Sequence, residues 1–171
     1  MHATLRESAD ALAARLKTLG DAAHVVAHSL GGLIACEAYA EPAELPKGRI
    51  VLLGAPVRGS RTARAVAAHW FGPAMLGPLA IAELARERHD TAPPPREVGV
   101  IAGTRSIGAG RLFCDLPAPN DGTVCIDETE LTGAFARTLL DVSHTGMLFS
   151  REVADATIAF LREGRFPHKG A

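Results

Sequence analysis

The sequence predicts an α/β fold of about four mainly parallel strands with helices on both faces. Strands are expected at four short apolar segments, residues 23–27, 49–53, 98–102 and 137–142. Helices are expected where apolar residues recur at helical spacing, at residues 4–19, 30–40, 60–69, 79–88 and 151–162. Because strands and helices alternate along the chain, they are predicted to form parallel βαβ units.

The first elements are defined by clear local signals. Leucines at near-helical spacing support the helix over 4–19, and Gly20 is its expected C-cap. The strand over 23–27 leads almost directly into the helix over 30–40, which Glu41 and Pro42 close. The strand over 49–53 is apolar on both faces, which is typical of a parallel strand covered by helices on each side.

The later elements are separated by longer connections. A glycine- and proline-punctuated apolar bridge joins the helices over 60–69 and 79–88, and the proline-rich residues 91–95 form a short stiff linker. Residues 104–134 are rich in loops. Residues 1–171 are therefore predicted to form one domain, with a possible cap or lid-like insert at about 60–95.

Composition excludes several classes of protein. Hydrophobic residues make up 47% of the 171 residues and charged residues 22%, so the chain is neither disordered nor fibrous. The net charge of -1 and an aromatic content of 5% argue against a nucleic-acid partner. The N-terminus has no apolar signal region, and no stretch has the length of a membrane span, so stable membrane insertion is not expected.

The three cysteines have no metal-ligand spacing. They fit reduced thiols and a cytoplasmic location, and a disulfide between Cys114 and Cys125 is the alternative. No metal site is predicted.

Residues 25–39 are the most informative segment of the chain. A β-branched apolar run ends at Ser29 and a helical pattern starts at Leu30, which predicts a strand, a tight turn and a helix with one hydroxyl at the apex. A strained turn of this kind requires small residues two positions away, and Ala27 and Gly31 meet that requirement. The helix start would point the N–H groups of Leu30 and Gly31 toward an oxyanion. The alternative is that Ser29 is an ordinary helix N-cap.

Two later residues could activate this serine. A serine hydroxyl needs a base, normally a histidine held by a carboxylate. His144 follows the fourth strand, and Asp121 lies in the loop after the third. His144 could instead be an ordinary loop histidine and Asp121 a turn aspartate. His28 is expected to point away from the site and to pack or form a hydrogen bond. The rival acids are Asp141, Asp127 and Asp115.

The chain resembles bacterial α/β-hydrolases of the small esterase/lipase type over nearly its whole length. The matching blocks are residues 27–32, 53–60, 120–122 and 143–146. The resemblance implies Ser29 as nucleophile, Asp121 as acid and His144 as base, in the chain order of that family. It also implies that Leu30 N–H is one oxyanion donor. The chain departs from the family by having Ala27 where glycine is usual. It also lacks the preceding strands and the His-Gly loop that supplies a second oxyanion donor.

The resemblance implies hydrolysis of apolar acyl esters, small molecules or lipids, through an acyl-enzyme that requires no metal or organic cofactor. The alternatives are a weak or inactive truncated relative, and an acyltransferase or thioesterase with the same triad. Without the preceding strands, the strand before Ser29 becomes a sheet edge, which predicts a homodimer through that edge. Apolar residues of the insert could line an acyl pocket, although core or dimer contacts are the alternative: Trp70, Phe71, Met75 and Leu76.

Overall fold

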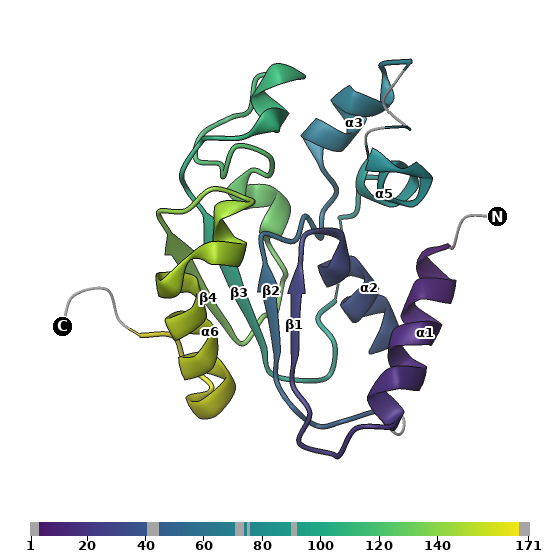
Figure 1. Ribbon diagram of the computed structural model, residues 1–171, viewed down its shortest axis with the longest axis vertical. Coiled ribbons are helices and arrows are strands. Elements are labelled where there is room, and N and C mark those ends of the chain that lie inside the picture. Colours follow the sequence, from purple (N-terminus) through teal and green to yellow (C-terminus); the bar gives the residue numbers. More distant parts are fainter. Residues whose placement is uncertain (1–3, 41–44, 71–73, 75, 90–91, 168–171) are drawn as a thin grey trace.

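A four-stranded parallel sheet forms the centre of the molecule (Figure 1). The computed structural model describes residues 4–40, 45–70, 74, 76–89 and 92–167. The strands follow the order of the sequence across the sheet: β1 (Val25–His28), β2 (Ile50–Leu53), β3 (Val98–Gly103) and β4 (Ala136–Leu140). The predicted α/β class and the four strands are thus confirmed, with strand ends that differ by at most two residues.

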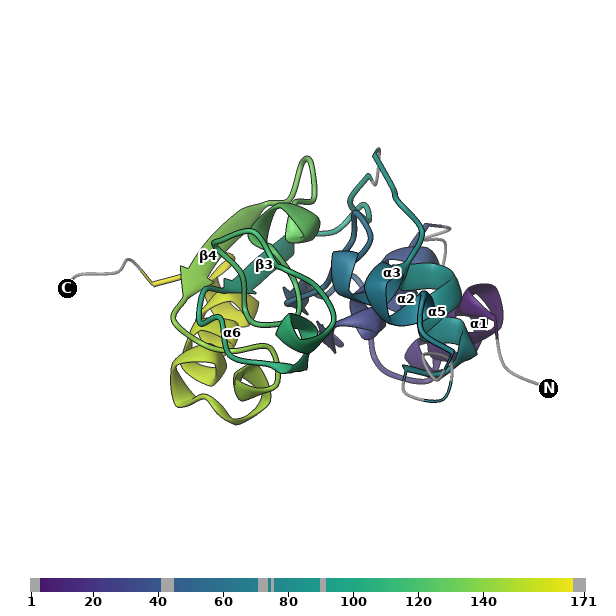
Figure 2. The same cartoon turned by 90° about the horizontal axis from the view of Figure 1, so that it is seen from above.

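Helices cover both faces of the sheet. Seen from above, α1, α2, α3 and α5 gather on one side of the molecule and α6 lies on the other (Figure 2). Their bounds are α1 (Leu5–Lys17), α2 (Leu30–Ala38), α3 (Arg61–Ala67), α5 (Pro78–Leu84) and α6 (Arg151–Glu163). Three single turns of 3₁₀ helix lie in the second half of the chain: η1 (Ala109–Leu112), η2 (Ile126–Thr129) and η3 (Gly146–Phe149).

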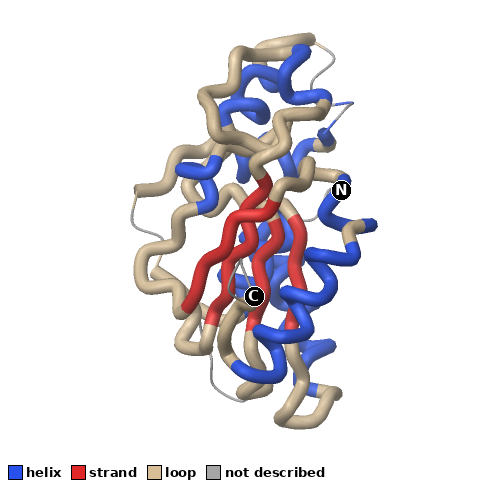
Figure 3. Tube along the Cα trace, turned by 90° about the vertical axis from the view of Figure 1, so that its left-hand side faces the viewer, coloured by secondary structure: helices blue, strands red, loops and turns tan. Residues whose placement is uncertain are grey.

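The side chains of β2 explain why the sheet needs helices on both faces. All four of its residues are buried. Ile50 and Leu52 belong to the apolar cluster on the side of α1 and α2, whereas Val51 and Leu53 pack in the cluster that includes Phe160 of α6. Because successive strand residues point to opposite faces, an uninterrupted apolar run places β2 between two helical layers. Figure 3 shows the strands side by side, with helices next to them.

Local sequence signals predict the start of α1 correctly but not its end. Thr4 caps the helix by accepting the Glu7 N–H at 3.1 Å, and the Glu7 carboxylate accepts the Thr4 N–H at 2.7 Å. The expected C-cap at Gly20 is wrong, because the helix already ends at Thr18. The Thr18 N–H and hydroxyl both donate to the Arg15 carbonyl, at 3.1 and 2.8 Å, and so close the last turn.

The strand that precedes Ser29 lies at one edge of the sheet, as predicted. β1 pairs only with β2 within the described part of the chain, and its Val26 side chain is 49% exposed. α6 packs against β2 on one face of the sheet. Among the helices that the structure describes, none has the length and apolar character needed to cross a membrane.

Candidate active site

Ser29 stands at the turn between β1 and α2 in a backbone conformation that side chains rarely adopt. Its φ is 54° and its ψ is -125°, and it is the one non-glycine residue with positive φ in the described part of the chain. The Ser29 N–H donates to the Leu53 carbonyl at 3.0 Å, and the Ser29 carbonyl accepts the Gly32 N–H at 2.9 Å. The turn is therefore fixed by main-chain bonds.

The hydroxyl of Ser29 does not serve as a helix cap. The serines and threonine before α1, α3 and α6 each accept a helix N–H through their side chains, whereas Ser29 makes no such bond to α2. The N-cap alternative thus fails on geometry. Leu30 and Gly31 are the first residues of α2, where N–H groups lack partners within the helix.

The requirement for small residues after Ser29 falls on Gly32 rather than on Gly31. A Cβ on Gly31 would lie 3.9 Å from the Ala27 Cβ, an ordinary contact, so the expectation that this position has no room is wrong. A Cβ on Gly32 would lie 2.3 Å from the Ala55 Cβ. The constraint therefore arises from the packing of α2 against the chain after β2, which local turn geometry does not reveal.

His144 and Asp121 form a buried pair. His144 Nδ1 lies 2.8 Å from Asp121 Oδ2, and the two residues are 8% and 1% exposed. A main-chain bond from His144 N–H to the Asp121 carbonyl, 2.9 Å long, supports the pair. The other carboxylate oxygen, Oδ1, accepts the N–H groups of Thr123 at 3.0 Å and Val124 at 2.7 Å. Asp121 is thus both a turn aspartate and the partner of His144.

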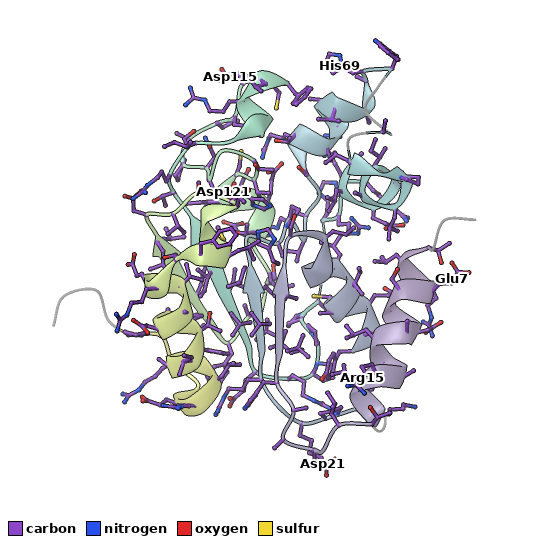
Figure 4. All side chains as sticks on the ribbon, in the orientation of Figure 1. Glu7, Arg15, Asp21, His69, Asp115 and Asp121 are labelled. Atoms are coloured by element: carbon purple, nitrogen blue, oxygen red, sulfur yellow. The ribbon has the colours of Figure 1, made fainter. Side chains whose placement is uncertain are left out.

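The rival carboxylates are engaged elsewhere. Asp141 pairs with Arg105 at 2.8 Å, and its side chain is 67% exposed. Asp127 pairs with Arg61 at 2.8 Å, and this hydrogen bond lowers the pKa of the Asp127 carboxyl. Asp115 is exposed, and Figure 4 shows it at the top of the molecule, apart from Asp121.

Two glycines at the carboxyl ends of the central strands make room for the pair. A Cβ on Gly54 would lie 3.1 Å from His144 Nδ1 and 3.2 Å from Asp121 Oδ2. A Cβ on Gly103 would lie 2.7 Å from Met147 Cε and 2.8 Å from the Asp121 Cβ. Neither glycine was predicted to have a role. Gly54 directly follows a buried strand and lies in the block 53–60 that resembles lipases, and this position was the signal in the sequence that could have indicated a role.

His28 connects the serine turn to the His144 loop. Its Nε2 donates to the His144 carbonyl at 3.0 Å, and the two ring centroids lie 4.5 Å apart. The expected hydrogen-bonding role of His28 is thus confirmed, but the ring points toward the pair rather than away from it. Burial lowers the pKa of the His28 imidazole, and the adjacent His144 lowers it further. Since Ser29 follows His28 directly, this hydrogen bond joins the main chain of His144 to the residue that precedes Ser29.

The residues expected to bind substrate are only partly described. Trp70 is 93% exposed and Leu76 is 38% exposed, so Trp70 does not form the wall of an enclosed pocket in this conformation. Phe71 and Met75 lie outside the described residues.

Two of the three cysteines are poorly suited to nucleophilic chemistry. All three are free thiols. Burial raises the pKa of Cys36 to about 12 and that of Cys125 to about 11, so both stay protonated at neutral pH. Within the described ranges, no group of three or more histidine, cysteine, aspartate or glutamate residues could hold a metal ion.

Comparison with known proteins gives a result only at the level of structure. No family model and no curated protein matches the chain. The Bacillus licheniformis lipase BlEst2 in its propeptide form superposes with a TM-score of 0.75 at 20% identity, over 98% of this chain and 43% of that one. The metagenomic carboxyl esterase MGS0156 superposes with a TM-score of 0.65 at 18% identity, over 82% of this chain and 51% of that one. The RedJ thioesterase of Streptomyces coelicolor superposes with a TM-score of 0.55 at 20% identity, over 92% of this chain and 66% of that one.

This likeness establishes the architecture. The chain spans less than half of the BlEst2 propeptide form and 74% of the mature form, which it matches with a TM-score of 0.70. The strand order, the serine turn and these superpositions agree: the chain has the fold of bacterial α/β-hydrolases of the esterase/lipase type, in an abbreviated four-stranded form.

Proposed function

We propose that this protein is a serine carboxylic-ester hydrolase that acts on apolar acyl esters through an acyl-enzyme. The observation that carries the proposal is the buried bond between His144 Nδ1 and Asp121 Oδ2, 2.8 Å long, beside the strained turn at Ser29. This combination of an uncapped serine and a carboxylate-held imidazole is what nucleophilic catalysis requires.

Acylation begins with proton transfer from Ser29. Because Asp121 holds the His144 Nδ1–H, the lone pair of Nε2 is left to accept the proton of the Ser29 hydroxyl. Ser29 Oγ attacks the ester carbonyl carbon, and the carbonyl electrons move to oxygen. His144 then returns its proton to the alkoxide leaving group as the C–O bond breaks, which releases an alcohol and leaves the acyl group on Ser29.

The N–H groups at the start of α2 stabilise the oxyanion. Leu30 N–H is the first donor and Gly31 N–H the second, and both carry the partial positive charge of a helix N-terminus. In the second half of the reaction His144 takes a proton from water, and the hydroxide attacks the acyl carbon. The bond from that carbon to Ser29 Oγ then breaks, His144 returns the proton to Ser29 Oγ, and a carboxylic acid leaves. No step requires a metal or an organic cofactor.

The substrate class follows from charge and composition. The net charge of -1 gives no attraction for highly charged substrates, so neutral esters of small molecules or lipids are proposed. Trp70, Phe71, Met75 and Leu76 stay predicted substrate contacts. A cytoplasmic location likewise stays a prediction from the cysteine pattern.

Hydrolysis of a p-nitrophenyl ester series by the purified chain tests the proposal. Ser29→Ala should abolish activity, and a fluorophosphonate should label Ser29 in the wild type. Ser150→Ala is the matched control, because this serine only caps α6, by accepting the Val153 N–H at 3.4 Å. Equal rates for Ser29→Ala and the wild type would refute the proposal.

A thioesterase or acyltransferase is the second candidate, favoured by the superposition on RedJ. The same triad would accept a thiol leaving group or an alcohol acceptor. Thioester substrates and added alcohols distinguish these reactions from ester hydrolysis. A weak or inactive relative with the same triad is the third outcome.

We also propose a homodimer in which β1 of one copy pairs with β1 of another. β1 is one of the two edge strands of the described sheet, and its Val26 side chain is 49% exposed. Such an edge invites pairing about a two-fold axis. Sedimentation at micromolar concentration should show a dimer for the wild type and a monomer for Val26→Lys. A stable wild-type monomer would contradict this arrangement.

A further inference from the structure

We propose that His28 is a positioning residue that holds the backbone of His144 at the serine turn. The inference rests on the proposed function, and it assigns to a residue outside the triad the task of keeping the base near the nucleophile.

The topology explains why such a connection is needed. Ser29 follows β1 and His144 follows β4, and these strands form the opposite edges of the described sheet. The loop that carries His144 must therefore extend across the ends of β2 and β3. Nothing in the pairing of β1 with β2 fixes where that loop comes to lie relative to Ser29.

The hydrogen bond from His28 supplies this connection. His28 Nε2 lies 3.0 Å from the His144 carbonyl, and the two residues are 116 positions apart in sequence. A carbonyl oxygen only accepts, so Nε2 must carry the hydrogen, which fixes the tautomer of a neutral His28 ring. Because His28 and Ser29 are consecutive, the bond ties the main chain of the base directly to the strand that ends in the nucleophile.

The His144 residue is held from two sides. Asp121 binds its ring through Nδ1 at 2.8 Å and accepts its N–H at 2.9 Å. His28 binds its carbonyl from the β1 side, and the two rings are tilted by 44° with centroids 4.5 Å apart. Asp121 thus orients the imidazole within its own loop, while His28 sets the position of the loop relative to the serine.

The charge state of His28 suits this role. Burial lowers the pKa of its imidazole, and His144 lowers it further, so the ring is neutral at neutral pH. A neutral donor does not repel the imidazolium that forms on His144 during acylation.

A pair of variants separates the hydrogen bond from the bulk of the ring. His28→Gln keeps an amide N–H near the position of Nε2, whereas His28→Phe keeps a ring and removes the donor. We expect His28→Phe to lower kcat about fivefold or more, the worth of one neutral hydrogen bond, with little change in KM. His28→Gln should restore most of kcat. If His28→Phe does not fold, His28→Asn, whose amide is too short to reach the carbonyl, takes its place.

A readout that does not depend on turnover keeps the inference separable from the proposed function. Amide hydrogen exchange in residues 143–147 should be about fivefold faster in His28→Phe than in the wild type, and near wild type in His28→Gln. An inactive wild type with this exchange pattern would refute ester hydrolysis and leave the attachment supported. An active wild type with unchanged kcat and exchange in His28→Phe would overturn it, as would equal losses in His28→Phe and His28→Gln.

Discussion

Replacing Gly54 with alanine is expected to slow ester hydrolysis by crowding the Asp121–His144 pair. The new Cβ would lie 3.1 Å from His144 Nδ1 and 3.2 Å from Asp121 Oδ2. Ordinary contacts begin near 3.5 Å, so these atoms must move by about 0.4 Å. A misplacement of about 1 Å can cost about 100-fold in rate, so a loss of about tenfold in kcat is expected. The positive φ of 52° adds a stability cost of about 1–2 kcal/mol.

Gly164→Ala is the matched control for this variant. Gly164 has a φ of 74°, and its Cβ would lie 3.2 Å from Arg49 Nη2 and 3.3 Å from Glu97 Oε2. Both variants therefore impose a left-handed backbone and crowd a hydrogen-bonded pair of side chains, but Arg49 and Glu97 lie at the opposite ends of β2 and β3 from the serine turn. Urea unfolding and initial rates of p-nitrophenyl ester hydrolysis should show similar losses of stability and a loss of kcat in Gly54→Ala alone. Equal kcat values for the two variants would refute the reasoning.

Asp121→Asn is expected to lower kcat/KM about 10³–10⁴-fold, whereas Asp141→Asn should leave it unchanged; similar losses in initial rate would contradict the choice of acid. Gly31→Ala should raise the free energy of unfolding by about 0.5 kcal/mol, because alanine favours the helix and has room there. Gly32→Ala should lower the free energy of unfolding by about 1–3 kcal/mol through overpacking. If urea unfolding showed that both glycine variants shift this free energy in the same direction, the result would be inconsistent with these contacts. The pKa of His28 is lowered below 6.5, so the unfolded chain binds the proton first on acidification. The stability gained from neutral His28 is thus complete above about pH 6.5 and is lost as the pH falls through the native pKa. The unfolding free energy of the wild type relative to His28→Gln should decline from about pH 7.5 to about pH 5. A difference that stays constant over this range would count against the lowered pKa of His28.

The fold was predictable because its signals are local. β2 and β3 are short apolar runs, and α2 follows β1 with only Ser29 between them. Helix ends were less accurate where tertiary bonds decide them. The helix expected over 79–88 ends at Leu84, whose carbonyl accepts the Ser60 N–H at 2.6 Å, and the Arg88 N–H donates to Arg58 at 3.0 Å. These bonds join the chain after α5 to the loop after β2, which periodicity does not report.

The pairing of Asp121 with His144 was predictable, whereas the residues that support this pair were not. Residue types and chain order were enough to predict that Asp121 and His144 act as a pair. The roles of Gly54, Gly103 and His28 depend on atoms that approach from segments remote in sequence. No pattern in a single sequence distinguishes a glycine that admits an imidazole from one that ends a strand.

We expect the open edge of β1 to affect the proposed ester hydrolysis. The strand that carries Ser29 is paired on one side only, through the register from Val25↔Ile50 to His28↔Leu53. A second copy paired along the open side would supply the bonds that an internal strand receives, and would stiffen the strained turn. Specific activity should therefore rise with protein concentration through the range in which dimers form, and Val26→Lys should give the lower value at every concentration. A specific activity independent of concentration, in samples that sedimentation shows to dimerise, would mean that β2 and the His28 bond alone hold the serine in place.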